Sequence, residues 1–264
     1  MTVLESILLG LLQGVTEFLP VSSSGHLLLA QKLLGLGNVP LLFDVFLHLA
    51  TLLVVILFFW KKLWSLLQAF FRVITRRSAS KDDVSYIVAV ICTTLVTGVI
   101  GVFVEKALPA FSLKFVCVGF IFTSVLLVLS SVLEKKNNAV AVPNWKQGLF
   151  IGFAQGIGTL PGVSRSGSTI SGALFCGVTR ETAGEFSFIA SIPAIFGAFL
   201  LELKDLGEVG SQIGAMPVLA GCIAAFASGV AALTVLMKIV KSGKLSYFAF
   251  YLVPAGILGL LFLH

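Results

Sequence analysis

Charged residues are scarce in this chain. Of its 264 residues only 11% are Asp, Glu, Lys or Arg, whereas 58% are hydrophobic and the mean hydropathy is +1.06. Because an ordinary soluble domain carries about 25% charged residues, this composition excludes a protein that faces water on all sides. We therefore expect an integral membrane protein whose outer surface contacts membrane lipids.

Cysteines are few, and basic residues are not clustered on one face. The net charge of +6 comes from Lys and Arg that lie between apolar runs, so we expect no nucleic-acid partner. The amino terminus lacks the basic segment of a cleavable signal peptide, and we expect the chain to be mature as it stands. The cysteines stand far apart inside apolar stretches and predict neither a disulfide framework nor a metal site; they are Cys92, Cys117, Cys176 and Cys222.

Long apolar runs dominate the sequence. A helix needs about 20 apolar residues to cross ~30 Å of hydrocarbon. Two apolar regions, 3–34 and 147–178, are interrupted by polar and helix-breaking residues, so that each of their arms is too short to cross. The runs that meet the required length are 41–60, 84–104, 113–133, 186–203, 214–237 and 245–263.

The two interrupted regions form an internal repeat with a shift of 142 positions. We therefore expect two repeats, 1–133 and 143–264, each with one broken segment followed by three spans, as in transporter-like folds. The residues that match are Gln13, Gly14, Val21, Ser22, Ser24 and Gly25 in the first region, and Gln155, Gly156, Val163, Ser164, Ser166 and Gly167 in the second.

Loop charges indicate how the broken segments lie in the membrane, because cytoplasmic loops collect Lys and Arg. If both segments are re-entrant hairpins, thirteen basic residues lie on one side and four on the other; if both cross, the ratio is ten to seven. The hairpins are favoured. The thirteen are Lys61, Lys62, Arg72, Arg76, Arg77, Lys81, Lys135, Lys136, Lys146, Arg180, Lys238, Lys241 and Lys244; the four are Lys32, Lys106, Lys114 and Lys204; Arg165 lies inside the membrane.

The fold class that follows is an all-α multi-pass membrane protein with six spanning helices and two re-entrant hairpins. Three crossings in each half, an odd number, place the two repeats in inverted orientations. Both termini then lie outside the cytoplasm, and the polar tips of the hairpins meet inside the bilayer. The stretch 61–81, which has six basic residues beside Trp60 and Trp64, predicts an amphipathic helix that contacts anionic lipid at the membrane surface.

The second tip has the groups of an anion site. Backbone that is neither helix nor barrel at membrane depth requires surrounding protein or a water-filled cavity. The free N–H groups of a helix that begins near Ile170 attract phosphate, and the guanidinium of Arg165 suits two phosphate oxygens. The candidate diphosphate ligands of this tip are Gly162, Ser164, Arg165, Ser166 and Thr169.

The first tip has complementary groups. Gln13 and Glu17 are four residues apart and share one helix face, where they could hold a divalent cation together with a diphosphate. Glu17 is equally a candidate base. The serines that follow are candidate nucleophiles or phosphate ligands beside a group that exchanges protons; these residues are Ser22, Ser23, Ser24 and His26.

Plainer structural roles stay open for these residues. Serine and glycine clusters in apolar helices often serve close packing. Glu17 and Arg165 could form an ion pair that only holds the hairpins together, and His26 could be a core histidine with satisfied hydrogen bonds. Asp44 and His48, four residues apart in the first span, are interpreted as a buried pair that supports the site.

The segments QGVTEFLPVSSSGH and PGVSRSGST resemble the undecaprenyl-pyrophosphate phosphatase family of the BacA/UppP type, and the resemblance covers the full length. The first segment fits the family's (E/Q)xxxE motif and its SS-x-GH element, and the second fits PGxSRSxxT. The residues that match are Gln13, Glu17, Ser22, Ser23, Gly25 and His26, followed by Pro161, Gly162, Ser164, Arg165, Ser166 and Thr169.

The resemblance implies an enzyme of the bacterial cytoplasmic (inner) membrane that hydrolyses undecaprenyl diphosphate to undecaprenyl phosphate and inorganic phosphate. This reaction recycles the carrier lipid of cell-wall synthesis and is associated with bacitracin resistance. The resemblance also implies a divalent cation, Mg²⁺ or Ca²⁺, and a site that opens to the outer face. Other members carry Glu in place of Gln13, so Glu17 is expected to matter more. A homodimer is left open.

The expected mechanism has Arg165 hold the diphosphate while Glu17 binds the metal or activates the attacking group. Ser23 attacks, and His26 is its base and the proton donor to the leaving oxygen. Attack by His26 itself or by a metal-activated water stays an alternative. At the level of function, a secondary transporter or flippase for a phosphorylated lipid or anion, and an inactive scaffold, also stay open, because the fold alone does not separate them.

Overall fold

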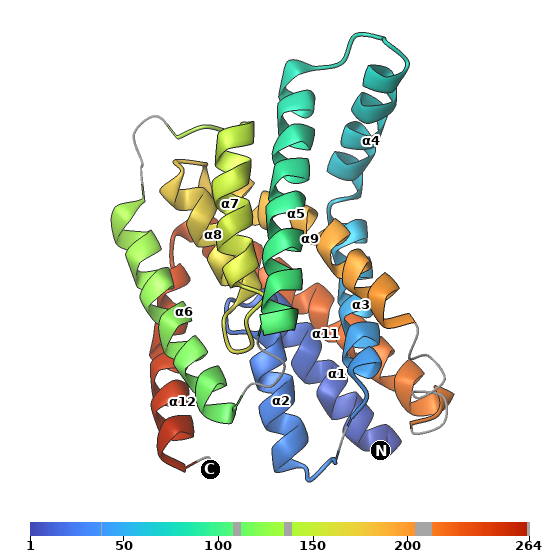
Figure 1. Cartoon of the computed structure of the whole chain (residues 1–264), viewed down its shortest axis with the longest axis vertical. Coiled ribbons are helices and arrows are strands. Elements are labelled where there is room, and N and C mark those ends of the chain that lie inside the picture. Colours follow the sequence, from blue (N-terminus) through green and yellow to red (C-terminus); the bar gives the residue numbers. More distant parts are fainter. Residues whose placement is uncertain (38, 108–111, 135–138, 204–212, 263–264) are drawn as a thin grey trace.

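The computed structural model describes residues 1–37, 39–107, 112–134, 139–203 and 213–262 and is all-helical there (Figure 1). Lys135, Lys136 and Lys204, which entered the loop-charge count, lie outside the described residues. The described part contains eleven α-helices: α1 (Val3–Phe18), α2 (Ser23–Leu33), α3 (Leu41–Phe58), α4 (Trp60–Ile74), α5 (Lys81–Ala107), α6 (Leu113–Leu133), α7 (Trp145–Ile157), α8 (Arg165–Phe175), α9 (Arg180–Glu202), α11 (Ala215–Ser242) and α12 (Ala249–Phe262), the last preceded by the 3₁₀ helix η2 (Leu245–Phe248).

Six helical segments of the described chain are long and apolar enough to cross a membrane, which confirms the six predicted spans. They are α3, α5, α6, α9, α11 and η2 with α12. The fourth begins earlier than predicted because Thr179 caps it by accepting a hydrogen bond from the backbone N–H of Thr182. The fifth runs on to Ser242, where Gly243 with φ 72° ends the helix.

Each interrupted region forms a helical hairpin. We call residues 13–26 the first tip and residues 158–169 the second tip; each comprises a turn and the helix ends that adjoin it. The helix α1 ends before Pro20, which holds Leu19 in an extended conformation with ψ 140°. The helices α1 and α2 extend from the first tip toward the end of the molecule where both termini lie, whereas α7 and α8 extend from the second tip to the opposite end (Figure 1).

Glycines let the first arm of each hairpin pack closely on a distant helix. In α1, Gly10 lies against the backbone of Gly221 in α11. In α7, a Cβ on Gly152 would stand 2.9 Å from the Cα of Thr93 in α5. Small residues at such positions allow helix backbones to approach, which drives helix association in lipid. Each hairpin is therefore held by a helix from the other half of the chain.

The predicted amphipathic stretch, 61–81, is helical as far as Ile74, where the helix α4 ends. Its aromatic residues Trp60 and Trp64 are exposed and stack with their ring centroids 5.6 Å apart. On another side of the helix, the Nζ atom of Lys62 lies 3.3 Å from a carboxylate oxygen of Asp83 in α5. The contact with anionic lipid stays a prediction.

Candidate active site

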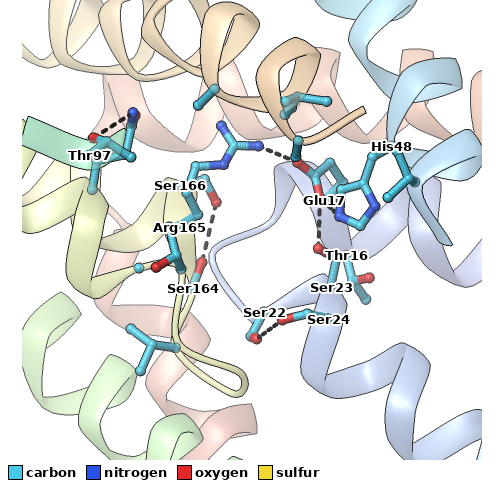
Figure 2. A pocket seen from close by; sticks show the side chains of 18 of the residues that line it. Thr16, Glu17, Ser22, Ser23, Ser24, His48, Thr97, Ser164, Arg165 and Ser166 are labelled. Atoms are coloured by element: carbon cyan, nitrogen blue, oxygen red, sulfur yellow. Dashed lines mark hydrogen bonds and ion pairs between the residues drawn. The ribbon is translucent and has the colours of Figure 1, made fainter. Parts of the chain in front are cut away.

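A cavity of about 430 Å³ lies where the two tips meet (Figure 2). Its polar end is lined by residues of both hairpins, and its apolar part continues between α3 and α9. The polar lining comprises Thr16, Glu17, Ser22, Ser23, Ser24, His48, Thr97, Gln155, Thr159, Ser164, Arg165 and Ser166; the apolar part is lined by Leu41, Val45, Ala194, Ile195, Ala198 and Leu201, with Glu202 beside them.

The carboxylate of Glu17 joins four side chains from four helices. Its Oε1 atom forms an ion pair with Nη2 of Arg165. Its Oε2 atom accepts hydrogen bonds from Oγ of Ser23 at 2.6 Å and from Nε2 of Gln13 at 3.1 Å. The Nε2 atom of His48 lies 3.4 Å from the same oxygen. The Glu17 side chain is only 5% exposed, so this carboxylate is buried among its partners.

Two helix N-termini point at the cavity. Ser23 is the first residue of α2 and Arg165 is the first residue of α8. The free N–H groups and the positive dipole end of a helix start favour anions. The Nη1 atom of Arg165 is buried and has no hydrogen-bond partner in the described part of the chain. The side chain of Arg165 keeps 17% of its surface exposed, so its guanidinium and the two helix starts make this end of the cavity suitable for a phosphate group.

The first tip is held in an unusual backbone conformation. Ser22 has φ 72°, which residues other than glycine seldom adopt. Its side chain also caps α2 by accepting a hydrogen bond from the N–H of Gly25 at 3.4 Å. Such strain persists where the surrounding structure enforces it, which is common at functional sites. The turn brings Ser23 to the carboxylate of Glu17.

His26 does not line the cavity. Its Nδ1 atom donates to the backbone oxygen of Ser22 at 2.8 Å, and its Nε2 atom lies 2.6 Å from the hydroxyl of Tyr251. The ring packs between Tyr251 and Phe120, with centroid separations of 5.6 and 4.9 Å. The expectation that His26 receives the proton of Ser23 is corrected by this geometry, because both ring nitrogens are engaged elsewhere and the hydroxyl of Ser23 donates to Glu17.

Serines of both tips line the cavity. Ser164 and Ser166 have their hydroxyl oxygens 3.3 Å apart, and the hydroxyl of Ser166 donates to the backbone oxygen of Phe18 at 3.2 Å. The second contact joins the two hairpins directly. Ser22 and Ser24 have a similar, longer hydroxyl pair at 3.5 Å.

Two predicted diphosphate ligands lie behind the cavity lining. Gly162 has φ 87° and packs against the backbone of Val116 in α6, so it shapes the tip. The hydroxyl of Thr169 donates to the backbone oxygen of Arg165 at 2.7 Å. Both residues therefore support the groups that face the cavity and do not face it themselves.

Asp44 and His48 do not form the side-chain pair that their spacing suggests. The Nδ1 atom of His48 donates to the backbone oxygen of Asp44 at 2.7 Å. The carboxylate of Asp44 instead accepts a hydrogen bond from Gln31 at 2.8 Å. His48 reaches Glu17 and lines the cavity, so the structure places it directly at the site.

Sequence reasoning missed Thr97 and assigned no role to Gln155. Gln155 is fully buried, and its amide donates to the hydroxyl of Thr97 at 3.1 Å. The correspondence of Gln155 with Gln13 in the repeat was a signal for the glutamine. A threonine inside an apolar span gives no such signal, because its neighbours in space come from another helix.

Comparison with known proteins places the chain in a family. Residues 6–258 match the family model described as bacitracin resistance protein BacA. An undecaprenyl-diphosphatase of Treponema denticola is 43% identical over 259 residues, which cover 97% of this chain and 96% of the relative. An undecaprenyl-diphosphatase of Borrelia recurrentis is 37% identical over 260 residues, or 95% of each chain. Because these matches span nearly the whole sequence, the chain belongs to the BacA family.

Proposed function

We propose that the cavity between the tips is the active site at which this chain hydrolyses undecaprenyl diphosphate. The chain is an undecaprenyl-diphosphatase, as its family and its relatives of nearly full-length similarity indicate. The observation that carries the assignment to this cavity is the convergence of Ser23, Glu17 and Arg165. A transporter or flippase would need the anion site, but it would not need a hydroxyl that donates to a buried carboxylate.

Arg165 and the two helix starts hold the diphosphate in this proposal. The guanidinium has one buried donor without a partner in the described chain, and Ser164 and Ser166 line the same cavity. Donors that are already in place stabilise the charge that develops on the phosphoryl oxygens without reorganisation. Positioning and charge stabilisation supply most of the rate enhancement in phosphoryl transfer.

Ser23 is the proposed nucleophile. Its Oγ atom attacks the terminal phosphorus, its proton passes to Oε2 of Glu17 at 2.6 Å, and undecaprenyl phosphate leaves. Water then hydrolyses the phosphoserine, which releases inorganic phosphate and restores the hydroxyl. A water molecule activated by Glu17 is the alternative nucleophile and would use the same carboxylate. A direct attack by His26 is disfavoured because the ring lies outside the cavity lining.

A divalent cation, Mg²⁺ or Ca²⁺, fits the donors of the first tip. Glu17 offers a carboxylate, and the Oε1 atom of Gln13 is buried without a hydrogen-bond partner in the described chain. No group of three or more His, Cys, Asp or Glu among the described residues is placed to hold a metal ion. Since Mg²⁺ commonly takes one or two carboxylates together with substrate phosphates, the substrate would complete the site, where the cation neutralises phosphate charge.

The chain is a multi-pass membrane protein, and we propose that its halves, 1–133 and 143–264, are inverted repeats with re-entrant hairpins. The opposite directions of the two hairpins in Figure 1 support this arrangement. The cavity runs toward Leu41, the first residue of α3, and Leu201, near the end of α9. In Figure 1 α3 begins and α9 ends on the side of the molecule that carries the termini, which supports a site open to the outer face of the cytoplasmic membrane and a prenyl tail that leaves between α3 and α9.

The test is phosphate release from undecaprenyl diphosphate by detergent-purified protein with Mg²⁺. We expect rapid release by the wild type, loss after EDTA with recovery on added Mg²⁺, and collapse in Glu17→Ala, Ser23→Ala and Arg165→Ala. His26→Ala is run beside them to rank His26 against Ser23. No release by folded, monodisperse wild-type protein would contradict the proposal and favour a carrier.

A further inference from the structure

The first spanning helix contributes a side chain to the site that neither hairpin motif contains. We propose that His48 is a positioning residue, whose imidazole holds the carboxylate of Glu17 in the orientation that receives the proton of Ser23. This inference rests on the proposed function and deepens it, because it assigns the orientation of the base to α3.

The ring of His48 is fixed from behind by its own helix. Its Nδ1 atom donates to the backbone oxygen of Asp44 one turn earlier at 2.7 Å. The carboxylate of Asp44 is engaged by Gln31, so it does not compete for the ring. With Nδ1 used in this way, Nε2 faces the Oε2 atom of Glu17 (Figure 2), 3.4 Å away. Since both ring nitrogens face acceptor oxygens, the ring forms this ion pair as an imidazolium, with an N–H on each nitrogen.

The two oxygens of Glu17 have different partners, which gives His48 a specific task. Oε1 pairs with Arg165, whereas Ser23, Gln13 and His48 all approach Oε2. When a diphosphate enters the cavity, its oxygens compete with Oε1 for the guanidinium. The restraint on Oε1 then weakens, while Gln13 and His48 still hold Oε2 beside the hydroxyl of Ser23.

A small displacement of this carboxylate is costly to the reaction. Misplacement of a catalytic group by about 1 Å can lower a rate about 100-fold. The position of the diphosphate depends on Arg165 and on the helix N-termini instead. Loss of the His48 contact should therefore lower kcat and leave KM nearly unchanged.

Three substitutions separate this role from a merely structural one. In His48→Gln the amide nitrogen reaches the position of the imidazole Nε2 and can still donate to Glu17. In His48→Asn the shorter amide reaches only the position of Nδ1, toward the backbone oxygen of Asp44. His48→Ala removes both contacts. The Gln and Asn variants are thus matched in chemistry and differ in reach.

We expect His48→Gln to keep kcat within about fivefold of the wild type, and His48→Asn and His48→Ala to lower kcat about 30-fold or more with KM changed less than about threefold. Each variant is checked for a monodisperse profile and for its melting temperature in detergent. Equal activity of the Gln and Asn variants, or a loss confined to KM, would overturn the proposal. A loss of kcat that follows a fall in melting temperature would also overturn it.

Infrared difference spectroscopy of the same variants tests the contact independently of activity. Glu17→Gln identifies the carboxylate band of Glu17, which we expect to be unchanged in His48→Gln and shifted in His48→Asn. An unshifted band in His48→Asn would refute the positioning role. If the band shifts in His48→Asn but the wild-type protein releases no phosphate, the contact between His48 and Glu17 is supported and the proposed function is contradicted.

Discussion

The two hairpins share a sequence pattern but carry opposite chemistry. Ser23 and Arg165 stand at matching positions of the pattern, 142 residues apart, and each is the first residue of the second arm of its hairpin. Both side chains reach the carboxylate of Glu17. One helix start thus presents a hydroxyl and the other a guanidinium, which in the proposed mechanism are the attacking group and the anion ligand.

The first arms of the two hairpins, α1 and α7, also carry different side-chain contacts at matching positions. Gln13 donates to Glu17, whereas the matching Gln155 donates to the hydroxyl of Thr97 and to the backbone oxygen of Ala190. The position of Glu17 is taken by Thr159 in the second hairpin. A carboxylate on both hairpins would bring two like charges together in a buried cavity, which is unfavourable. The proposed mechanism therefore uses unlike side chains on a similar scaffold.

The largest effect on activity is expected from removing the guanidinium of Arg165 in the second hairpin. Arg165→Ala should lower kcat/KM about 1,000-fold, because it removes the phosphate ligand and leaves Glu17 buried without its counter-charge. Arg165→Lys should still lose about 100-fold, since an ammonium cannot bridge a carboxylate and a phosphate as a planar guanidinium does. Phosphate release measures both. Near-normal activity of the Lys variant would show that only the charge matters.

Removing the hydroxyl of the first hairpin should have the next largest effect. Ser23→Ala should lower kcat about 100-fold or more and leave the melting temperature unchanged. Ser171→Ala is the matched control: this serine is buried in α8, does not line the cavity, and its hydroxyl has no hydrogen-bond partner in the described chain. We expect the control to stay within about twofold of the wild type. Comparable activity of the two variants would exclude Ser23 as nucleophile.

His26 is expected to act on the shape of the first tip. His26→Ala removes the hydrogen bond to Ser22 and the ring contacts with Phe120 and Tyr251, so it should lower kcat about tenfold or more and also lower the melting temperature by several degrees. Tyr251→Phe removes only one hydrogen bond and should cost less than about fivefold in kcat. A large loss of activity in His26→Ala at an unchanged melting temperature would instead place His26 in the reaction.

The smallest effects concern how the first arms are packed. Gly10→Ala in α1 should lower the free energy of unfolding by about 1–3 kcal/mol, because a Cβ there collides with the backbone of Gly221. Gly98→Ala in α5 is the control, since no heavy atom of the described chain lies within 4 Å of the added Cβ apart from the nearby backbone of its own helix and its chain neighbours. It should be neutral or more stable by up to about 1 kcal/mol. Melting in detergent compares the two; equal melting temperatures would argue against close packing of α1 on α11.

Most of the fold could be predicted from the sequence because the number of consecutive apolar residues that a helix needs to cross a bilayer is nearly constant. The ends of the spans were less predictable, since they depend on capping by residues such as Thr179 and Gly243. The repeat pattern and the ionisable residues inside apolar segments located Glu17 and Arg165, because buried charges in a membrane have few roles other than function.

The sequence by itself determined the membrane class, the six spans and the meeting of a carboxylate, a hydroxyl and a guanidinium. Only the tertiary structure decided the tasks of the two histidines. His26 points to Tyr251, 225 residues away in the chain, and His48 crosses from α3 to a carboxylate in α1. The physical reason is that spacing along a helix defines which face a side chain occupies, whereas its partner is defined by whichever distant helix packs against that face.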